Sequence, residues 1–146
     1  MTVLGHQRAT LSVDGTDVVF YSVHPIPPIT FTAGFNVAQH TQALSDVIVR
    51  AKQESAPVIL LGDFNMTDQF HEYRRIQRSF TDAYKAVGDV GFGFTYPHDK
   101  WTGVPPLLRL DYIFYSPAFQ GVRTDVGADS GSSDHAPLVA TLRLAQ

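Results

Sequence analysis

Residues 58–65, VILLGDFN, join a continuous apolar run to a glycine, an acid and an amide. An apolar run of this length without alternation is typical of a strand that is buried on both faces. Pro57 directly precedes the run and ends the helix that is predicted before it. The stretch therefore predicts a central strand over residues 58–61, with Asp63 and Asn65 directly after it.

Two elements are predicted upstream of this strand. Residues 11–13 and 17–23 form a hairpin around Asp14-Gly15, because this dipeptide tolerates the positive φ of a tight turn. Prolines at positions 25, 27 and 28 prevent the second strand from continuing, which places His24 at its end. Residues 36–54 are predicted to form a helix with one apolar stripe. A capping box at its start is expected between Asn36 and Gln39.

The downstream half is predicted to be mixed. A second helix runs from Thr67 or Asp68 to about residue 80, with inward-facing residues at 70, 73 and 76. Residues 86–109 are rich in glycine, proline and aromatic residues and are expected to form a long loop of the kind found at active sites. Strands follow at 111–115, 121–126 and 136–144, with a turn of small residues at 130–134.

The composition limits the class of protein and the kind of metal site. With 146 residues, 44% of them hydrophobic, the chain is expected to form one domain over residues 1–146. It contains no cysteine, so a metal would be held by oxygen and imidazole, which favours Mg²⁺, Mn²⁺ or Ca²⁺ over a structural zinc. No apolar run is long enough to span a bilayer, and the first ten residues do not resemble a signal peptide. A soluble protein, cytoplasmic by default, is the expectation.

Polar side chains gather at the predicted strand ends. Asp63 and Asn65 lie two residues apart and would point to one side of an extended chain, a plausible site for a hard cation. Asp111 opens an apolar strand and needs a partner, which His135 could provide. These polar residues also have explanations that involve no function. Asp63 could form an Asx turn, residues 134–135 could form a surface turn, and His24 could be a structural histidine. Three arginines, at positions 74, 75 and 78, are interpreted mainly as a solvated helix surface, with phosphate steering as the alternative.

Four segments together resemble the successive motifs of the endonuclease/exonuclease/phosphatase family. They are residues 23–25 (VHP), 61–65 (LGDFN), 109–114 (RLDYIF) and 133–138 (SDHAPL), in the family's order. The resemblance implies an α/β fold with mixed β-sheet flanked by helices. It also implies hydrolysis of phosphodiesters or phosphomonoesters assisted by a divalent metal, Mg²⁺ or Mn²⁺ with Ca²⁺ as a further possibility.

The resemblance also implies roles for individual residues. Asp63 and Asn65 would position the metal and the attacking water, and Asp134 would be a metal ligand. His135 would act on the nucleophile or the scissile phosphate, and the predicted metal-binding set is Asp63, Asn65, Asp134 and His135.

Two further members complete the predicted catalytic set. Asp111 would orient His135, and His24 would assist the leaving oxygen as a general acid. The full catalytic prediction is His24, Asp63, Asn65, Asp111 and His135.

The chain departs from the family pattern in one respect. The family carries a metal-binding glutamate early in the domain, whereas Glu54 and Glu72 are the two glutamates here and both fall on predicted helices. The chain therefore resembles about half of the family's sandwich, with the opening segment missing. We expect weaker metal binding, and completion of the exposed sheet face by a second copy in a homodimer.

The leading functional prediction is a metal-dependent nuclease acting on DNA, or alternatively on RNA. A phosphatase or lipid phosphodiesterase on the same scaffold is the second hypothesis. The third is a catalytically silent domain that acts by binding or dimerisation. Substrate choice is expected to lie in two loops, residues 25–36 and 86–109, whose aromatic residues could stack on bases or contact lipid: Phe31, Phe35, Phe92, Phe94, Tyr96 and Trp101.

Overall fold

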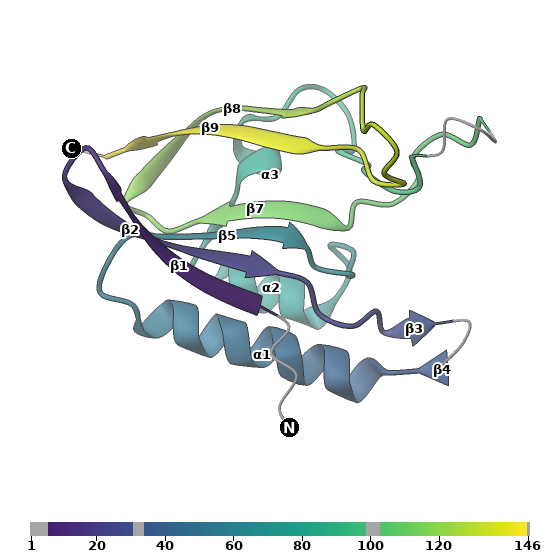
Figure 1. Ribbon diagram of the computed structural model, residues 1–146, viewed down its shortest axis with the longest axis horizontal. Coiled ribbons are helices and arrows are strands. Elements are labelled where there is room, and N and C mark those ends of the chain that lie inside the picture. Colours follow the sequence, from purple (N-terminus) through teal and green to yellow (C-terminus); the bar gives the residue numbers. More distant parts are fainter. Residues whose placement is uncertain (1–5, 31–33, 99–102, 146) are drawn as a thin grey trace.

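Two larger layers of β-structure and three helices make up the part of the chain that the computed structural model describes, residues 6–30, 34–98 and 103–145 (Figure 1). A five-stranded sheet has the order β1-β2-β5-β7-β6, and β8 pairs with β9 in a separate two-stranded sheet. A small third sheet joins β3 and β4. The elements are β1 (His6–Val13), β2 (Thr16–Val23), β3 (Ile29–Thr30), β4 (Gly34–Phe35), α1 (Val37–Gln53), β5 (Val58–Asp63), α2 (His71–Gln77), β6 (Thr81–Asp82), α3 (Ala83–Val87), β7 (Asp111–Tyr115), β8 (Phe119–Val126) and β9 (Leu138–Leu144).

The five-stranded sheet is mixed, as predicted. β2 and β5 run parallel and are connected through α1, whereas the other neighbouring pairs are antiparallel. The β1–β2 hairpin turns through Asp14 and Gly15, whose φ values of 50° and 80° are those that a tight two-residue turn requires. The predicted hairpin is confirmed, and β1 begins earlier than predicted.

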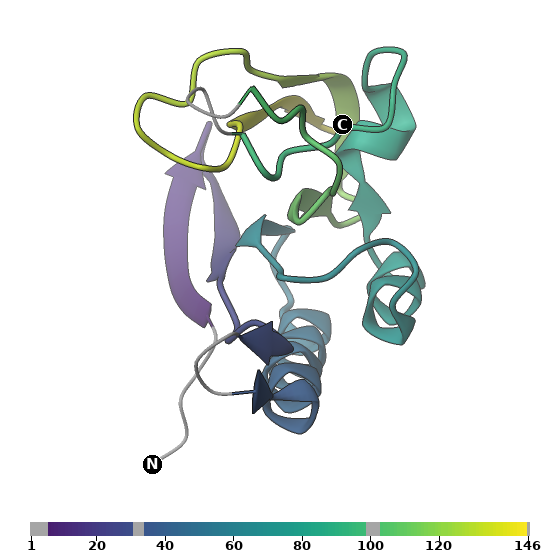
Figure 2. The same ribbon diagram turned by 90° about the vertical axis from the view of Figure 1, so that its right-hand side faces the viewer.

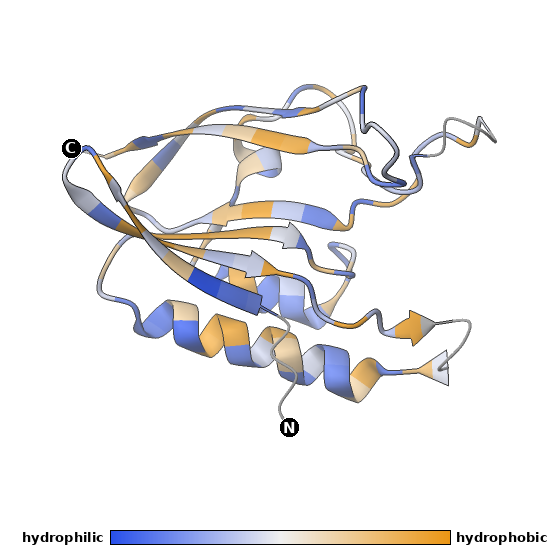
Figure 3. Ribbon diagram, viewed as in Figure 1, coloured by the Kyte–Doolittle hydropathy of each residue, from blue (hydrophilic) through white to orange (hydrophobic). Residues whose placement is uncertain are grey.

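The helices α1 and α2 cover one face of the five-stranded sheet, and the β8–β9 sheet with α3 lies on the other face (Figures 1 and 2). The apolar stripe predicted for α1 is buried against the sheet and consists of Leu44, Val47, Ile48 and Ala51. Residues of β5 alternate between the two sides: Val58 and Leu60 join the core beneath the helices, and Ile59 joins the core on the β8–β9 side. The prediction of a strand buried on both faces is confirmed, and orange segments run along β5 in Figure 3.

Two local predictions are wrong, and two short elements were not predicted. Asn36 precedes α1, but its side chain makes no capping hydrogen bond, so the capping box is absent. α2 begins at His71 because Phe70 adopts an extended conformation and packs against the core, while Asp68 binds Lys85 Nζ at 3.1 Å. β6 and α3 were not predicted, since each is too short to show a periodic pattern.

Among the described residues, no helix is both long and apolar enough to cross a membrane.

A buried ion pair connects β6 to the segment before β7. Arg109 Nη2 lies 2.9 Å from Asp82 Oδ2, and the side chains are 6% and 1% exposed. The hydroxyl of Tyr73 donates to the same carboxylate at 2.7 Å, and Asp82 Oδ1 caps α3 by accepting the amide of Tyr84. The Asp82 carboxylate therefore pairs with a buried cation, accepts a hydrogen bond from a buried phenol and caps the start of α3.

Asp82→Ala is expected to destabilise the protein by about 3–5 kcal/mol, because it leaves the Arg109 charge buried without its partner. Urea unfolding followed by circular dichroism measures this change. Asp125→Ala is the matched control: it breaks the exposed pair with Arg123, at 2.7 Å, and is expected to leave the free energy of unfolding close to that of wild type. Equal losses in the two variants would contradict this account of the buried pair.

Candidate active site

Two carboxylates face each other where β5 ends and β7 begins. Asp63 is the last residue of β5 and Asp111 the first of β7, and the antiparallel register pairs them directly. Asp63 lies four residues from Ile59 in β5, and Asp111 lies four residues from Tyr115 in β7. Ile59 and Tyr115 join the core on the β8–β9 side, and residues four apart on a strand share a face, so both carboxylates lie on that face of the sheet. Like charges directly opposite each other are unfavourable unless a positive group lies nearby. The register alone therefore points to a cationic partner.

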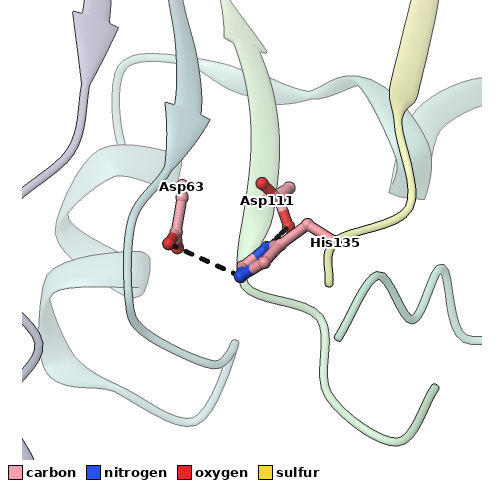
Figure 4. Close-up of side chains that lie close together, drawn as sticks. All are labelled: Asp63, Asp111 and His135. Atoms are coloured by element: carbon pink, nitrogen blue, oxygen red, sulfur yellow. Dashed lines mark hydrogen bonds and ion pairs between the residues drawn. The ribbon is translucent and has the colours of Figure 1, made fainter. Parts of the chain in front are cut away.

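His135 supplies a partner for both acids (Figure 4). Its Nδ1 lies 2.7 Å from Asp111 Oδ2, and its Nε2 lies 3.9 Å from Asp63 Oδ2. Because a carboxylate accepts, the short contact places a hydrogen on Nδ1 and fixes the orientation of the ring. The ring of Tyr96 packs against it with a centroid separation of 4.8 Å.

The turn that carries His135 is attached to the loop of residues 95–98 by backbone hydrogen bonds. The amide of Ala136 donates to the carbonyl of Thr95 at 2.8 Å, and the amide of His98 donates to the carbonyl of Asp134 at 2.6 Å. His98 Nδ1 also lies 2.9 Å from the hydroxyl of Ser130. The loop thus holds the turn beside the β5–β7 strand ends.

His24 lies at the outer side of this group. It follows the last residue of β2, and its Nε2 is 3.7 Å from Asp63 Oδ2. Its side chain is 74% exposed, whereas those of Asp63, Asp111 and His135 are 18%, 19% and 23% exposed. Asp63 Oδ2 therefore faces one half-buried and one accessible imidazole.

The environment changes the pKa of two of these groups. Burial raises the pKa of Asp63, with a further rise from Asp111, against the lowering effect of the Asn65 amide that binds its Oδ1 at 2.8 Å. For His135, burial lowers the pKa, but the hydrogen bond and charge of Asp111 and the charge of Asp63 outweigh it, so that the net shift is upward. A larger share of His135 is therefore charged at neutral pH than for an isolated histidine.

Asp111→Asn is expected to lower the pKa of His135, because it removes the adjacent charge while leaving the ring buried. Because the pKa of His135 is raised on folding, the charged imidazole stabilises the folded chain. This stabilisation is present below pH 6.5, the ordinary pKa of histidine, and is lost as the pH rises through the pKa of the folded state. The stability difference between wild type and Asp111→Asn should therefore be largest below pH 6.5 and decline above it. Proton NMR titration of His135 in both proteins measures the shift, and an unchanged pKa would contradict the assigned pairing.

Asn65 does not lie as the sequence argument assumed. Its φ is +48°, so the chain is not extended there and the two-residue alternation with Asp63 is lost. Its amide Nδ2 donates to the carbonyl of Pro25 at 3.1 Å, which fixes Asn65 next to the segment carrying His24. The left-handed conformation is one that asparagine tolerates better than most residues.

Asp134 is exposed and lies outside the group of acidic and histidine side chains whose ligand atoms converge. That group, among the described residues, consists of Asp63, Asp111 and His135, with one ligand atom of each within 4.8 Å of the others. Two carboxylates and one imidazole suit a hard divalent cation such as Mg²⁺ or Mn²⁺. Metal binding by Asp134 and Asn65 stays a prediction.

Neither glutamate lies in this group. Glu54 follows α1, accepts from the hydroxyl of Tyr21 at 2.7 Å and pairs with Arg8 at 2.7 Å. Glu72 lies on α2 and is 6% exposed. The departure from the family pattern noted in the sequence is therefore found in the structure as well.

Two aromatic residues of the loops predicted to select the substrate, Phe35 and Phe92, are largely exposed. Phe35 is 82% exposed at the end of β4. Phe92 is 77% exposed and stacks on Phe94 with ring centroids 5.1 Å apart. Phe31 and Trp101 lie outside the described residues. The sequence did not predict the contact between Tyr96 and His135, because it depends on how the long loop folds back.

The chain is similar to a known protein family, to curated relatives and to solved structures. Residues 3–135 match the Endonuclease/Exonuclease/phosphatase family. A UPF0294 protein of Vibrio parahaemolyticus is 29% identical over 133 residues, which cover 90% of this chain and 42% of that protein. The chain thus spans less than half the length of this curated relative.

The fold is shared by solved structures, among them two bacterial proteins. One is the endonuclease/exonuclease/phosphatase of Beutenbergia cavernae, with a TM-score of 0.70 and 27% identity over 94% of this chain and 38% of that chain. The other is the mannosyl-6-phosphatase of Bacteroides thetaiotaomicron, with a TM-score of 0.66 and 23% identity over 89% and 52%. Because the family match extends over most of the sequence and includes the segments that bring Asp63, Asp111 and His135 together, the chain belongs to the endonuclease/exonuclease/phosphatase family.

Proposed function

We propose that the chain hydrolyses phosphodiesters with the help of a divalent metal, and that DNA is the substrate. The observation that carries this proposal is His135, which is held by Asp111 at Nδ1 while its Nε2 faces Asp63. A phosphodiester needs a proton acceptor for the attacking water and a positive group for the charge that develops on phosphate. Asp63 and His135 provide these two functions side by side.

The proposed reaction begins with water bound at Asp63 Oδ2. This oxygen lies 3.9 Å from His135 Nε2, too far for a direct hydrogen bond, which leaves the single Nε2–H of His135 free to donate to a phosphate oxygen. Asp63 accepts a proton as the water attacks phosphorus, and the protonated form of His135, which the pairing with Asp111 favours, donates a hydrogen bond to a phosphate oxygen. His24, which is accessible and 3.7 Å from Asp63, donates a proton to the leaving oxygen.

A divalent metal would be held by carboxylate oxygens of Asp63 and Asp111, with Asn65, Asp134 and His135 as the further predicted ligands. His135 would bind it only as the neutral imidazole, because the protonated ring has no lone pair to offer. When bound, it would offset the charge on phosphate and lower the pKa of bound water. We expect weak binding because no glutamate lies at the site.

The experiment that distinguishes the candidate substrates uses the same protein on three phosphate classes. Supercoiled plasmid DNA tests nuclease activity, a mannose 6-phosphate release assay tests phosphatase activity, and phospholipid vesicles test the lipid alternative. The phosphatase arm is included because the mannosyl-6-phosphatase has a similar fold. Strand cleavage that requires Mg²⁺ or Mn²⁺ would support the proposal. Phosphate release without strand cleavage would replace it with the phosphatase alternative.

We also propose that a second copy covers the open part of the sheet on the β8–β9 side. Phe20, Leu61 and Ile113 are only partly buried there, and no residue of β9 is fully buried. Within the described ranges β9 pairs with β8 alone, so one of its edges has no neighbouring strand. Exposed apolar sheet surface of this kind favours association.

Sedimentation velocity at concentrations from about one to a hundred micromolar tests this pairing, in a range chosen for association of moderate strength. The expected result is a shift of the sedimentation coefficient from that of a monomer to that of a dimer. A single monomeric species throughout the series would contradict the proposed homodimer.

A further inference from the structure

His40 is a buried histidine that sits on α1, directly behind the segment carrying Asp63. It is fully buried and extends the apolar stripe of α1 by one turn, four residues before Leu44. Its Nε2 lies 3.0 Å from the carbonyl oxygen of Phe64. Because a carbonyl only accepts, Nε2 carries the hydrogen and donates it.

The Phe64 carbonyl belongs to the same peptide group as the Asn65 amide. That amide donates to Asp63 Oδ1 at 2.8 Å. One peptide plane is thus bound on both sides, by His40 at its oxygen and by Asp63 at its nitrogen. Hydrogen bonds arranged in series through a polar group strengthen one another, so the His40 contact supports the contact to Asp63.

This peptide plane determines which oxygen of Asp63 is free. With Oδ1 engaged by the amide, Oδ2 is the oxygen that lies 3.9 Å from His135 and 3.7 Å from His24. The plane adopts an uncommon geometry, because Asn65 has a φ of +48°. A residue in the left-handed region requires support from its surroundings, and His40 provides it from the helix side.

Packing alone does not require an imidazole at this position. The ring meets Phe70 edge-on, with centroids 5.8 Å apart, but its Nδ1 is buried and has no hydrogen-bond partner among the described residues. A leucine would fill similar space without burying an unpaired polar atom. What the histidine adds is the hydrogen bond to Phe64.

We propose that His40 is a positioning residue that holds the Phe64–Asn65 peptide plane and, through it, keeps Asp63 Oδ2 turned toward His135. The role in catalysis rests on the proposed phosphodiester hydrolysis, whereas the positioning itself is a property of the folded chain. The sequence signal was present, since a histidine occupies an apolar position at helical spacing from Leu44.

The test compares three variants of the full 146-residue chain. His40→Leu removes the donor, His40→Gln keeps an N–H donor, and Val47→Ala is the packing control, because Val47 is fully buried on the same helix face and does not contact the Phe64 carbonyl through a hydrogen bond. In His40→Leu we expect about tenfold faster hydrogen exchange of the Asn65 amide and about tenfold lower kcat with little change in KM. His40→Gln should stay within about threefold of wild type, and so should the Asn65 exchange of Val47→Ala, in line with a role for the donor alone.

Each outcome decides the proposal. A folded His40→Leu protein with wild-type Asn65 exchange and kcat would overturn it. If His40→Leu does not fold, the wild-type protein still supplies a test: a ¹⁵N–¹³C scalar coupling from His40 Nε2 to the Phe64 carbonyl supports the proposal, and its absence overturns it. If wild type hydrolyses no phosphoester, the proposed function fails, while the exchange and coupling measurements still decide the role of His40.

Discussion

Replacing His135 with alanine is expected to lower kcat for phosphodiester hydrolysis by roughly 10²–10⁴-fold, the range for loss of a positioned acid–base group. The imidazole is the group that connects the two carboxylates, with Nδ1 2.7 Å from Asp111 and Nε2 facing Asp63. Its removal takes away the charge that would stabilise the phosphate and leaves Asp63 and Asp111 opposed without a cation. Steady-state kinetics with bis-p-nitrophenyl phosphate and Mn²⁺ measures the effect.

The matched control for this variant is His71→Ala. His71 begins α2, and its side chain is 71% exposed, so its loss should leave kcat within about twofold of wild type, as for an ordinary surface substitution. Circular dichroism shows whether each variant is folded. A folded His135→Ala protein that keeps more than about a tenth of wild-type kcat would remove His135 from the mechanism, since a loss that small lies below the acid–base range.

Asp63→Ala is expected to reduce activity by a similar factor, roughly 10²–10⁴-fold, and to weaken Mn²⁺ binding as well. Asp63 Oδ2 is the oxygen that faces both His24 and His135, and the pKa of the carboxyl is raised by burial, which suits a group that accepts a proton. Isothermal titration with Mn²⁺ and the kinetic assay separate the two effects. Loss of both is expected because one carboxylate serves water and metal.

Asp17→Ala is the control for the loss of a carboxylate, since Asp17 is exposed on β2. It should leave both Mn²⁺ affinity and kcat close to those of wild type. If Asp63→Ala retains wild-type Mn²⁺ affinity but loses activity, Asp63 acts on the water alone. If it retains activity, the assigned role is wrong.

The elements with strong periodic patterns were predictable from the sequence. The apolar run of β5 required burial on both faces, and the structure covers it with helices on one side and the β8–β9 sheet on the other. The stripe of α1 fixed its buried face because apolar residues recur at helical spacing. The strand ends that carry Asp63, Asp111 and His135 could also be located in this way.

The details that depend on tertiary contacts were not predictable. The left-handed backbone of Asn65 is supported by contacts with Pro25 and His40, which lie far from it in the sequence. β6 and α3 are stabilised by the buried carboxylate of Asp82 rather than by a periodic pattern. The contact of Tyr96 with His135 depends on the fold of a loop without periodicity.

The measurement that tests the central claim most directly is cleavage of supercoiled plasmid DNA by the wild-type chain in Mg²⁺ or Mn²⁺. EDTA-treated protein and the folded His135→Ala variant are assayed beside it. The account predicts nicked and linear DNA from wild type with metal and intact plasmid from both controls. Intact plasmid from folded wild-type protein with both metals, or equal cleavage by His135→Ala, would contradict a metal-dependent nuclease site built on Asp63, Asp111 and His135.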